Sequence, residues 1–403
     1  MAESAALLPQ LRCIRRDIHR RPERGLHLPE TLDRVLRPIS KLGLDVTRSK
    51  TISSAVVRIA GRKSGPTVVL RADLDALALQ EDTGLDFASE IPLLMHACGH
   101  DLHAAIGVGA IQLLAAHRDQ LAGDVLFLFQ PGEEGFGGAA HMLKEGALGI
   151  AQTEFAGAYA LHVTTDRPLG IFTTKAGSFM AGSVTLDVTV RGRGGHGSAP
   201  HLALDPNQAV AQIISGLQVM ITRRFNVFDP VILTVGWMRG GEPGTSNVIP
   251  NSASFSATTR TFSEANRIAA QTYSRDLVVG IATAFGLEAD VTFRPIMRPL
   301  LNDPDHTLLA ERVAVEMFGK DRFEVEANPR AGGEDFAEVL REVPGAFVFV
   351  GACPPELDPG TAPYNHSNLA RFDDSILSDA SAYLAALAFA RLDSEVVQAN
   401  ALL

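Results

Sequence analysis

The sequence predicts an α/β protein: a main domain with a mixed, largely parallel sheet flanked by helices, plus an inserted ferredoxin-like (β-α-β-β-α-β) domain. Between about residues 65 and 165, unbroken apolar segments such as PTVVLRADL and FAGAYALHV alternate with helix-like stretches, as strands buried on both faces do. In the middle of the chain, SVTLDVTVRG alternates apolar with polar residues, which is typical of a strand with one face in solvent. A length of 403 residues fits two domains.

The predicted elements of the main domain alternate between helix and strand. An N-terminal helix is expected because Leu7, Leu11, Ile14 and Ile18 recur at helical spacing. The apolar, alanine-rich stretch 101–118 is predicted as a helix between two buried strands. The pattern returns near the C-terminus, where PGAFVFVGACP indicates a strand and DSILSDASAYLAALAFARL a helix.

The inserted domain follows a different pattern. After its first strand, Asp205 as N-cap and Pro206 at the first position open a helix. The strands PVILTVGWM and NSASFSATTR, a helix from Ser263 and the strand EADVTFRP complete the β-α-β-β-α-β order. The predicted boundaries are 1–180 and 292–403 for the main domain and 181–291 for the inserted domain.

Composition and charge exclude several classes of function. A hydrophobic content of 46% with 20% charged residues indicates a folded globular protein, and a net charge of −10 argues against nucleic acid or an anionic membrane as partner. The N-terminus lacks the apolar core of a signal peptide, and no apolar run reaches the ~18 residues needed to cross a bilayer. The 3 cysteines are far apart, so a reducing, cytoplasmic location is expected.

Polar side chains that can bind metal follow several of the predicted strands. Ligands bind α/β sheets beyond the carboxyl ends of the strands, so these side chains are expected at one edge of the sheet. They are Asp73 and Asp75 after the strand at 67–71, Glu133 and Glu134 after 125–130, His162 after 156–161, and His366 after 346–350.

The segment MHACGHD adds a thiol and an imidazole. In an extended segment Cys98 and His100 project to the same side, and thiolate, imidazole and carboxylate all suit a divalent transition metal. Asp101 follows directly and is placed to hold a ligand histidine in its correct tautomer. A buried thiol beside a satisfied histidine is the commoner meaning of such a pair, but the other histidines and carboxylates favour a metal site.

Glu133 and Glu134 directly follow an apolar strand and a turn, where a solvated helix face is not expected. Neighbouring side chains diverge, so one glutamate can bind metal while the other stays free as a base. A carboxylate beside a metal-activated water can accept its proton and pass it to a leaving amine. The residues alone do not assign which glutamate has which role.

The motifs RADLDAL, MHACGHD, QPGEEG, LHV, GGHGSAPH, SNVIP, GGEDF and NHSN, in that order, resemble the two-metal peptidase and aminoacylase family. They are most similar to its hippurate hydrolase and indoleacetyl-amino acid hydrolase branch, over about residues 10 to 390. The resemblance implies a catalytic α/β domain with an inserted lid, and a hydrolase that cleaves the amide bond of N-acyl amino acids.

The resemblance also implies roles for individual residues. Glu133 is the implied general base, and Cys98 would bridge two divalent ions, with zinc or manganese expected and cobalt or nickel tolerated. More distant members place a histidine before the aspartate of the first motif, whereas this sequence has Asp73 before Asp75. Both are therefore expected to support the ligands, or to serve as alternate ligands. The implied ligands are Cys98, His100, Glu134, His162 and His366.

In the lid, His196 matches the family histidine that stabilises the oxyanion, often across a dimer interface, so a homodimer through the lid is expected. Asn247 and Arg260 match residues that grip the substrate carboxylate, which suits the arginine fork, although Arg260 alone would also fit a surface ion pair. Gly332 and Gly333 would let backbone N–H groups approach the substrate. Remaining side chains near these motifs are expected to have a structural role: His96, His103, His201, Trp237 and Met238. For the last two, lining an acyl pocket is the alternative.

Three other functions fit parts of the pattern. A dipeptidase or carboxypeptidase would use the same machinery. A thiol hydrolase would use Cys98 as nucleophile with a histidine base, which predicts inactivation by thiol reagents and indifference to chelators. A small-molecule or metal-binding module would lack the base, but Glu133 is present. An N-acyl amino acid is thus the expected small-molecule partner.

Overall fold

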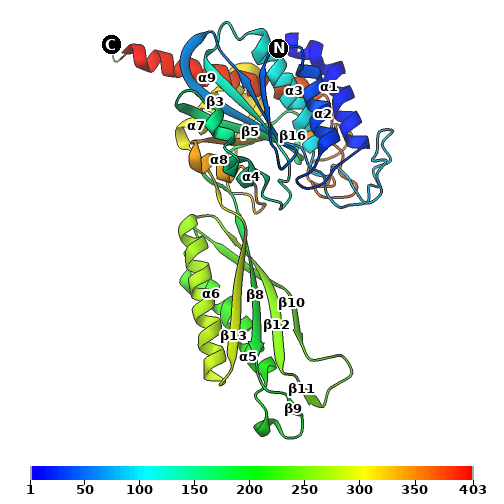
Figure 1. The fold of residues 1–403 in the computed structure, drawn as a ribbon, viewed down its shortest axis with the longest axis vertical. Coiled ribbons are helices and arrows are strands. Elements are labelled where there is room, and N and C mark those ends of the chain that lie inside the picture. Colours follow the sequence, from blue (N-terminus) through cyan, green and yellow to red (C-terminus); the bar gives the residue numbers. More distant parts are fainter. Residues whose placement is uncertain (1, 402–403) are drawn as a thin grey trace. The chain divides into compact units, whose positions relative to one another are not determined.

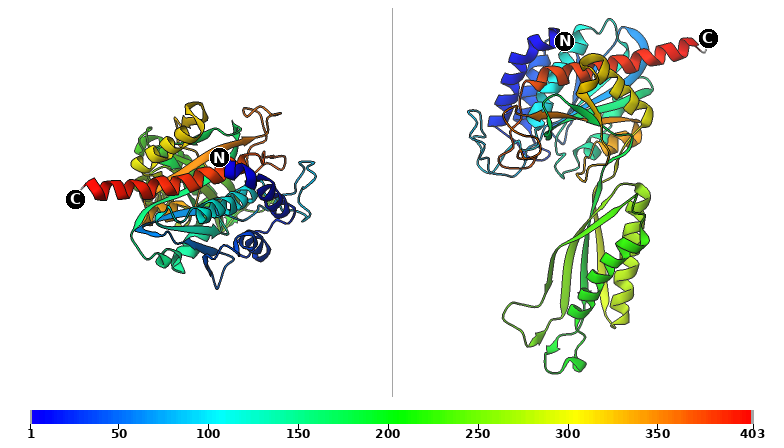
Figure 2. Two further views of the ribbon diagram at one scale, coloured as in Figure 1. Left: turned by 90° about the horizontal axis from the view of Figure 1, so that it is seen from above. Right: turned by 180° about the vertical axis from the view of Figure 1, so that it is seen from behind.

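The computed structural model describes residues 2–401, and for 394–401 only the backbone of a helix. The chain forms two compact units (Figures 1 and 2), the main domain (Met1–Gly177, Leu301–Asn328 and Asp335–Leu403) and the inserted domain (Ser178–Leu300 and Pro329–Glu334). The boundary predicted at 291 falls inside strand β13 (Glu288–Met297). The short segment Pro329–Glu334, which contains Gly332 and Gly333, groups with the inserted domain.

The main domain is built on one mixed sheet. Its central strands β4, β3, β5 and β16 are parallel, whereas β2 and β6 pair antiparallel with β4 and β16. The predicted mixed, largely parallel sheet is therefore confirmed. In spatial order the strands are β1 (Asp45–Arg48), β2 (Ala55–Ile59), β4 (Ala122–Gln130), β3 (Lys63–Asp73), β5 (Phe155–Pro168), β16 (Gly345–Cys353), β6 (Phe172–Thr174) and β15 (Phe323–Val325).

Helices flank this sheet, and one large apolar core lies between the sheet and a group of them. Val68, Leu70 and Ala72 of β3 point into this core, so the alternate residues of β3 face the other side of the sheet. The core also takes Leu11 and Ile18 of the N-terminal helix, as its spacing predicted. The helices are α1 (Ala2–Arg20), α2 (Pro29–Leu36), α3 (His100–Ala116), α4 (Gly138–Lys144), α7 (Pro304–Phe318), α8 (Ala337–Glu342) and α9 (Ile376–Ala401), with short 3₁₀ turns at Arg37–Ile39, Ala147–Ile150 and Lys320–Arg322.

The inserted domain has the predicted ferredoxin-like order. Its antiparallel sheet runs β10-β12-β8-β13, and the alternate residues of β8, such as Leu186 and Val190, are buried against α5 and α6. Asp205 and Ser263 cap these helices by accepting the N–H groups of Asn207 and Asn266. The elements are β8 (Gly182–Arg191), α5 (Pro206–Arg224), β10 (Val231–Gly240), β12 (Ser252–Thr261), α6 (Glu264–Ala284) and β13.

Smaller elements complete the described chain. In the inserted domain, β9 (Gly195–His196) pairs with β11 (Val248–Ile249), and a 3₁₀ turn spans Pro200–Leu202. The strands β7 (Gly177–Met180) and β14 (Leu300–Asn302) lie where the chain passes between the two units. Within residues 2–401, no helix combines the length and the apolar character that crossing a bilayer requires.

Candidate metal centre

The central strands deliver the candidate side chains to one end of the main sheet. Asp73 is the last residue of β3, and the loop after β4 carries Glu133 and Glu134. His162 was expected just after its strand but lies inside β5, because pairing with β16 extends that strand to Pro168. His366 lies in the loop after β16, where its N–H donates to the Ala97 carbonyl (2.9 Å).

Cys98 and His100 do reach one centre, but not from an extended segment as predicted. Gly99 between them has φ of 87°, and His100 is already the first residue of α3. A side chain at Gly99 would meet Val163 Cγ2 at 2.3 Å, so the turn needs glycine for its backbone angle and for space. The Cys98 Sγ lies 3.4 Å from His162 Nε2 and 3.2 Å from His366 Nε2.

The candidate ligands form two groups that share the Cys98 thiol. One is Cys98 with His100 and His162, and the other is Cys98 with Glu134 and His366; in each group the ligand atoms lie within 4.8 Å of one another. Both ring nitrogens of His100 are buried and have no hydrogen-bond partner among the described residues. Because an unpaired buried polar group is costly, a cation at this place fits the residues better than an apolar cavity would.

Electrostatics make the centre sensitive to a bound cation. Burial and the Glu134 carboxylate raise the pKa of the Cys98 thiol, and hydrogen bonds to Cys98 and Glu134 raise the pKa of His366 to about 10. Burial would lower the pKa of His100, but Asp73 and Cys98 outweigh it and raise that pKa well above its usual value. A divalent ion binds the thiolate and the neutral imidazole, so metal binding here would release protons.

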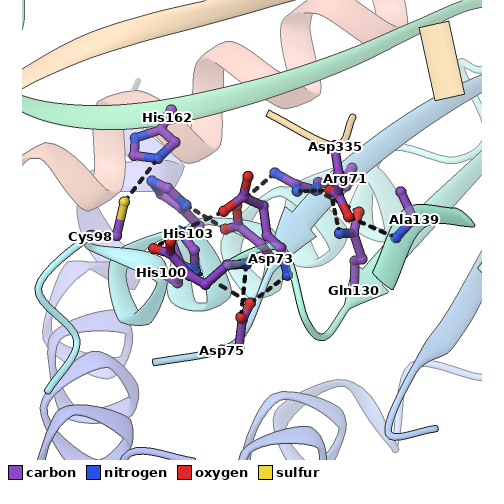
Figure 3. Close-up of polar contacts among 12 residues, drawn as sticks. Arg71, Asp73, Asp75, Cys98, His100, His103, Gln130, Ala139, His162 and Asp335 are labelled. Atoms are coloured by element: carbon purple, nitrogen blue, oxygen red, sulfur yellow. Dashed lines mark hydrogen bonds and ion pairs between the residues drawn. The ribbon is translucent and has the colours of Figure 1, made fainter. Parts of the chain in front are cut away.

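The carboxylates of Asp73 and Asp75 lie beside the candidate ligand His100 (Figure 3). The Asp75 carboxylate accepts the backbone N–H groups of Glu133 (2.9 Å) and Glu134 (3.1 Å), and its Oδ1 lies 3.6 Å from His100 Nδ1. Asp73 lies 2.5 Å from His103 Nδ1. Since His103 Nε2 accepts the Val163 N–H (2.9 Å), the proton of a neutral His103 sits on Nδ1 and is donated to Asp73. His103 is thus satisfied at both nitrogens.

Asp101 has different partners from those predicted. Its Oδ2 lies 2.7 Å from Arg15 Nε and 2.8 Å from His19 Nδ1, both on α1, so it contacts a histidine that is not a candidate ligand. The first turn of α3 directs Asp101 toward α1, and residue patterns gave no sign of this tertiary contact. Burial would lower the pKa of His19, but Asp101 and Glu81 outweigh it and raise that pKa. His96 is buried beside this group, and burial lowers its pKa to about 3.

The inserted domain holds the remaining predicted residues at two separate places. His196 lies on β9, where its Nδ1 accepts the N–H of Ser198 (3.1 Å), so a neutral His196 carries its proton on Nε2 as a donor. Asn247 is adjacent, because its carbonyl accepts the Gly197 N–H (2.7 Å). His201, in the neighbouring 3₁₀ turn, is exposed.

Arg260 lies at the other end of the sheet. It pairs with Ser183 on β8, whereas the end of β8 at Arg191 pairs with Ser252. Arg260 is therefore separated from the Arg191 end of β8 by about eight residues of strand, or ~27 Å at ~3.4 Å per residue. Within the described chain the half-buried Arg260 side chain has no hydrogen-bond or ion-pair partner, and burial lowers its pKa.

The other inserted-domain residues are placed as follows. The Gly332 carbonyl accepts the Ala181 N–H (2.9 Å), and Gly333 packs against Met297. Trp237 and Met238, expected to have a packing role or to line an acyl pocket, are 54% and 61% exposed, so neither is buried within its own chain.

Two buried residues of the main domain were not singled out from the sequence. Arg71 lies inside the motif RADLDAL and Gln130 begins QPGEEG, and both are buried on the same face of the sheet as Asp73. A charged residue within the apolar run VVLRAD was the available signal, because arginine is almost never buried without partners.

Comparison with known proteins identifies a family to which this chain belongs. The family model described as peptidase family M20/M25/M40 matches residues 69–390. The chain therefore belongs to this family, and it is a hydrolase, as the sequence motifs implied.

Relatives across nearly the full length carry several activities in their names. N-acetylcysteine deacetylase of Bacillus subtilis is 34% identical over 382 residues, covering 94% of this chain and 96% of the relative. Thermostable carboxypeptidase 1 of Saccharolobus solfataricus is 34% identical over 383 residues (94% and 93%). IAA-amino acid hydrolase ILR1-like 4 of Arabidopsis thaliana is 34% identical over 356 residues (87% and 79%).

A solved structure shows the same fold. The YxeP protein of Bacillus subtilis, named a dinuclear metal binding peptidase of the M20 family, is 31% identical with a TM-score of 0.82, covering 96% of this chain and 99% of that chain. The catalytic-plus-lid fold class expected from the sequence is therefore confirmed.

The Asp101 contacts generate a stability prediction. Asp101→Asn should lower the free energy of unfolding by about 3 kcal/mol, because it leaves buried Arg15 without its countercharge and leaves protonated His19 with Glu81 alone. Urea unfolding at pH 6 measures the loss. The control is Glu30→Gln, which breaks the exposed pair with Arg34 and should change stability by under about 0.5 kcal/mol. Equal effects of the two substitutions would refute the electrostatic role of Asp101.

Proposed function

We propose that this chain is a metal-dependent amidohydrolase that cleaves N-acyl amino acids into a carboxylic acid and a free amino acid. The observation that carries the proposal is the pair of ligand groups sharing Cys98, with the Glu133 carboxylate close to Glu134 and His100. Relatives named for deacetylation and for hydrolysis of an amino acid conjugate support the substrate class.

Five residues would hold two divalent ions, with zinc or manganese expected and cobalt or nickel compatible: Cys98, His100, Glu134, His162 and His366. Their thiol, imidazole and carboxylate donors suit such ions. When bound, the ions would act as Lewis acids on the scissile carbonyl and acidify a water molecule.

Glu133 would be the general base. It takes the proton of the attacking water and gives it to the leaving amine. Its backbone is fixed by Asp75, which accepts the N–H groups of Glu133 and Glu134 together. Neighbouring side chains diverge, so Glu134 can bind metal while the Glu133 carboxylate serves as the base.

The inserted domain would bind the substrate and the developing charge. His196, with its Nε2 proton free to donate, would stabilise the oxyanion. Arg260 would bind the substrate carboxylate with its guanidinium fork, and its lack of an ion pair among the described residues leaves that fork available. Asn247 would assist, and Gly332 and Gly333 would let the backbone approach the substrate.

A homodimer through the inserted domain would reconcile these roles. Arg260 lies ~27 Å along β8 and β12 from the Arg191 end of β8, which leads into the loop that carries His196, so one copy is not expected to bring both to one substrate. β10 is an edge strand with exposed apolar residues, among them Ile232 and Trp237, and such edges favour pairing with another chain. His196 would then act on the partner's metal centre.

The main alternative is a carboxypeptidase on the same machinery, which the name of one relative at the same identity favours. The two functions differ in substrate, which is a peptide for a carboxypeptidase and an N-acyl amino acid for the proposed amidohydrolase. Substrate ranking distinguishes them.

The first experiment assays amine release from a panel of N-acyl amino acids and peptides. The enzyme is tested after chelation, and again after refilling with zinc or manganese. We expect chelation to abolish cleavage of N-acyl amino acids and metal to restore it. Preference for peptides over every N-acyl amino acid would favour the carboxypeptidase. Activity that resists chelators but is lost to thiol reagents would instead identify Cys98 as a nucleophile.

Adjacent glutamates should fail in different ways. Glu133→Gln should keep both metals and lose ~10²–10⁴-fold in kcat, because it removes proton transfer alone. Glu134→Gln should lose metal. Metal content by elemental analysis and kcat on the best panel substrate give the result. Normal turnover of metal-loaded Glu133→Gln would remove Glu133 from the mechanism.

Mixing two inactive variants tests the shared site. His196→Ala and Glu133→Gln should each be inactive alone. Mixed one to one after subunit exchange, they should recover about a quarter of wild-type activity, because half of the dimers are mixed and each mixed dimer has one intact site. Light scattering should give twice the 43.0 kDa chain mass. No recovery from a confirmed mixed dimer would place His196 in its own chain's site.

A further inference from the structure

Arg71 is the most constrained charged residue on the site face of the main sheet. It lies on β3, 1% exposed, where a guanidinium out of water is stable only if its donors are all used. Its Nε donates to Gln130 Oε1 (3.0 Å), and its two Nη atoms reach Asp73 Oδ2 (2.6 Å) and Asp335 Oδ1 (3.2 Å). Figure 3 shows the guanidinium between the two carboxylates.

Asp335 extends this network to a second element. Its Oδ1 accepts the Gln130 Nε2–H (2.7 Å), and its Oδ2 accepts the backbone N–H of Ala139 (3.0 Å). Gln130 is the last residue of β4, and Ala139 lies in the first turn of α4. The Arg71–Asp335 pair therefore holds both ends of the loop 131–138, which carries Glu133 and Glu134.

This loop is rich in glycine, and its own backbone bonds are few, among them Gly138 N–H to the Gly132 carbonyl (3.1 Å). It contains Gly132, Gly135, Gly137 and Gly138, and the first three have positive φ. Glycine has the largest backbone entropy to lose on ordering, so a fixed geometry must come from contacts at the ends and in the middle. Asp75 provides the contact in the middle, and Arg71 with Asp335 provides those at the ends.

We propose that Arg71 and Asp335 are positioning residues for the proposed reaction, which fix the Glu133–Glu134 loop through Gln130 and Ala139. Neither side chain is given a role on the substrate or on a metal. Their effect is on the placement of the base, where an error of about 1 Å can cost ~10²-fold in rate. The inference rests on the proposed function for its kinetic consequence, but not for its structural one.

Three variants disrupt the clamp, which is the network of Arg71, Asp335 and Gln130 that holds the loop 131–138. Each variant does so in a different way. Asp335→Asn keeps the size of the side chain but places an amide where it must accept the Ala139 N–H. Arg71→Lys keeps the charge but loses the fork that reaches three partners. Gln130→Met removes the uncharged link, at the cost of the Arg71 Nε acceptor, but keeps both carboxylates and the guanidinium, and so serves if the other two fold poorly.

The matched control breaks an ion pair at the start of β4, the strand that ends at Gln130. Asp124→Asn removes the Arg58–Asp124 contact (2.7 Å) at the start of β4. It should lower the melting temperature as the clamp variants do, yet leave kcat unchanged. This separates positioning from a general loss of sheet stability.

Two readouts decide the proposal. In hydrogen–deuterium exchange on the whole protein, peptides spanning 131–139 should exchange faster in Asp335→Asn and Gln130→Met, but not in Asp124→Asn. In the amine-release assay, kcat should fall by ~10²-fold in Asp335→Asn, with KM and metal content unchanged. Unchanged exchange in this segment, or a kcat equal to that of the control, would overturn the proposal. The exchange result stands even if wild-type protein cleaves none of the panel, so failure of the proposed function is a distinguishable outcome.

Discussion

Charged side chains are buried together at the carboxyl ends of β3 and β4, and each must be paired there because an isolated buried charge is far too costly. Asp73 pairs with Arg71 and His103, and Asp335 pairs with Arg71. Asp75 accepts two backbone N–H groups. These pairings leave few conformations open to the loop after β4. The interactions that make the charges tolerable in the fold thus also set the geometry of the candidate site.

Two stacked histidines on α3 differ in their hydrogen-bond partners, and this difference distinguishes a supporting residue from a candidate metal ligand. His100 and His103 lie with ring centroids 5.3 Å apart, and both are buried. His103 is bonded at both nitrogens, to Asp73 and to the Val163 N–H, so it has nothing left to offer an ion. His100 has no hydrogen-bond partner at either nitrogen among the described residues, although carboxylates lie near. The same residue type in the same turn is therefore a support in one case and a candidate ligand in the other.

Much of this arrangement could be predicted because it follows from local pattern and one topological rule. Unbroken apolar strands indicated the parallel sheet, and the carboxyl ends of such strands meet at one edge, which gathered Asp73, Glu133 and His162. Partners set by tertiary packing could not be read in this way. Asp101 faces α1 because of how α3 packs, and β5 continues past His162 because β16 lies beside it. Arg71 was visible only as a charge in an apolar run, and one of its partners, Asp335, is 264 residues away in the chain.

Strand geometry sets a limit on what one inserted domain can do. An N-acyl amino acid spans about two residues, or ~7 Å fully extended, whereas ~27 Å of paired strand separates Arg260 from the end of β8 that leads to His196. Either one of the two assignments is wrong, or a second copy supplies one of the groups. The local structure favours keeping both, because Ser198 fixes a donor proton on His196 Nε2 and burial without a partner keeps Arg260 ready for an anion. The proposed homodimer would meet this limit, because each site would take one of the two groups from each copy.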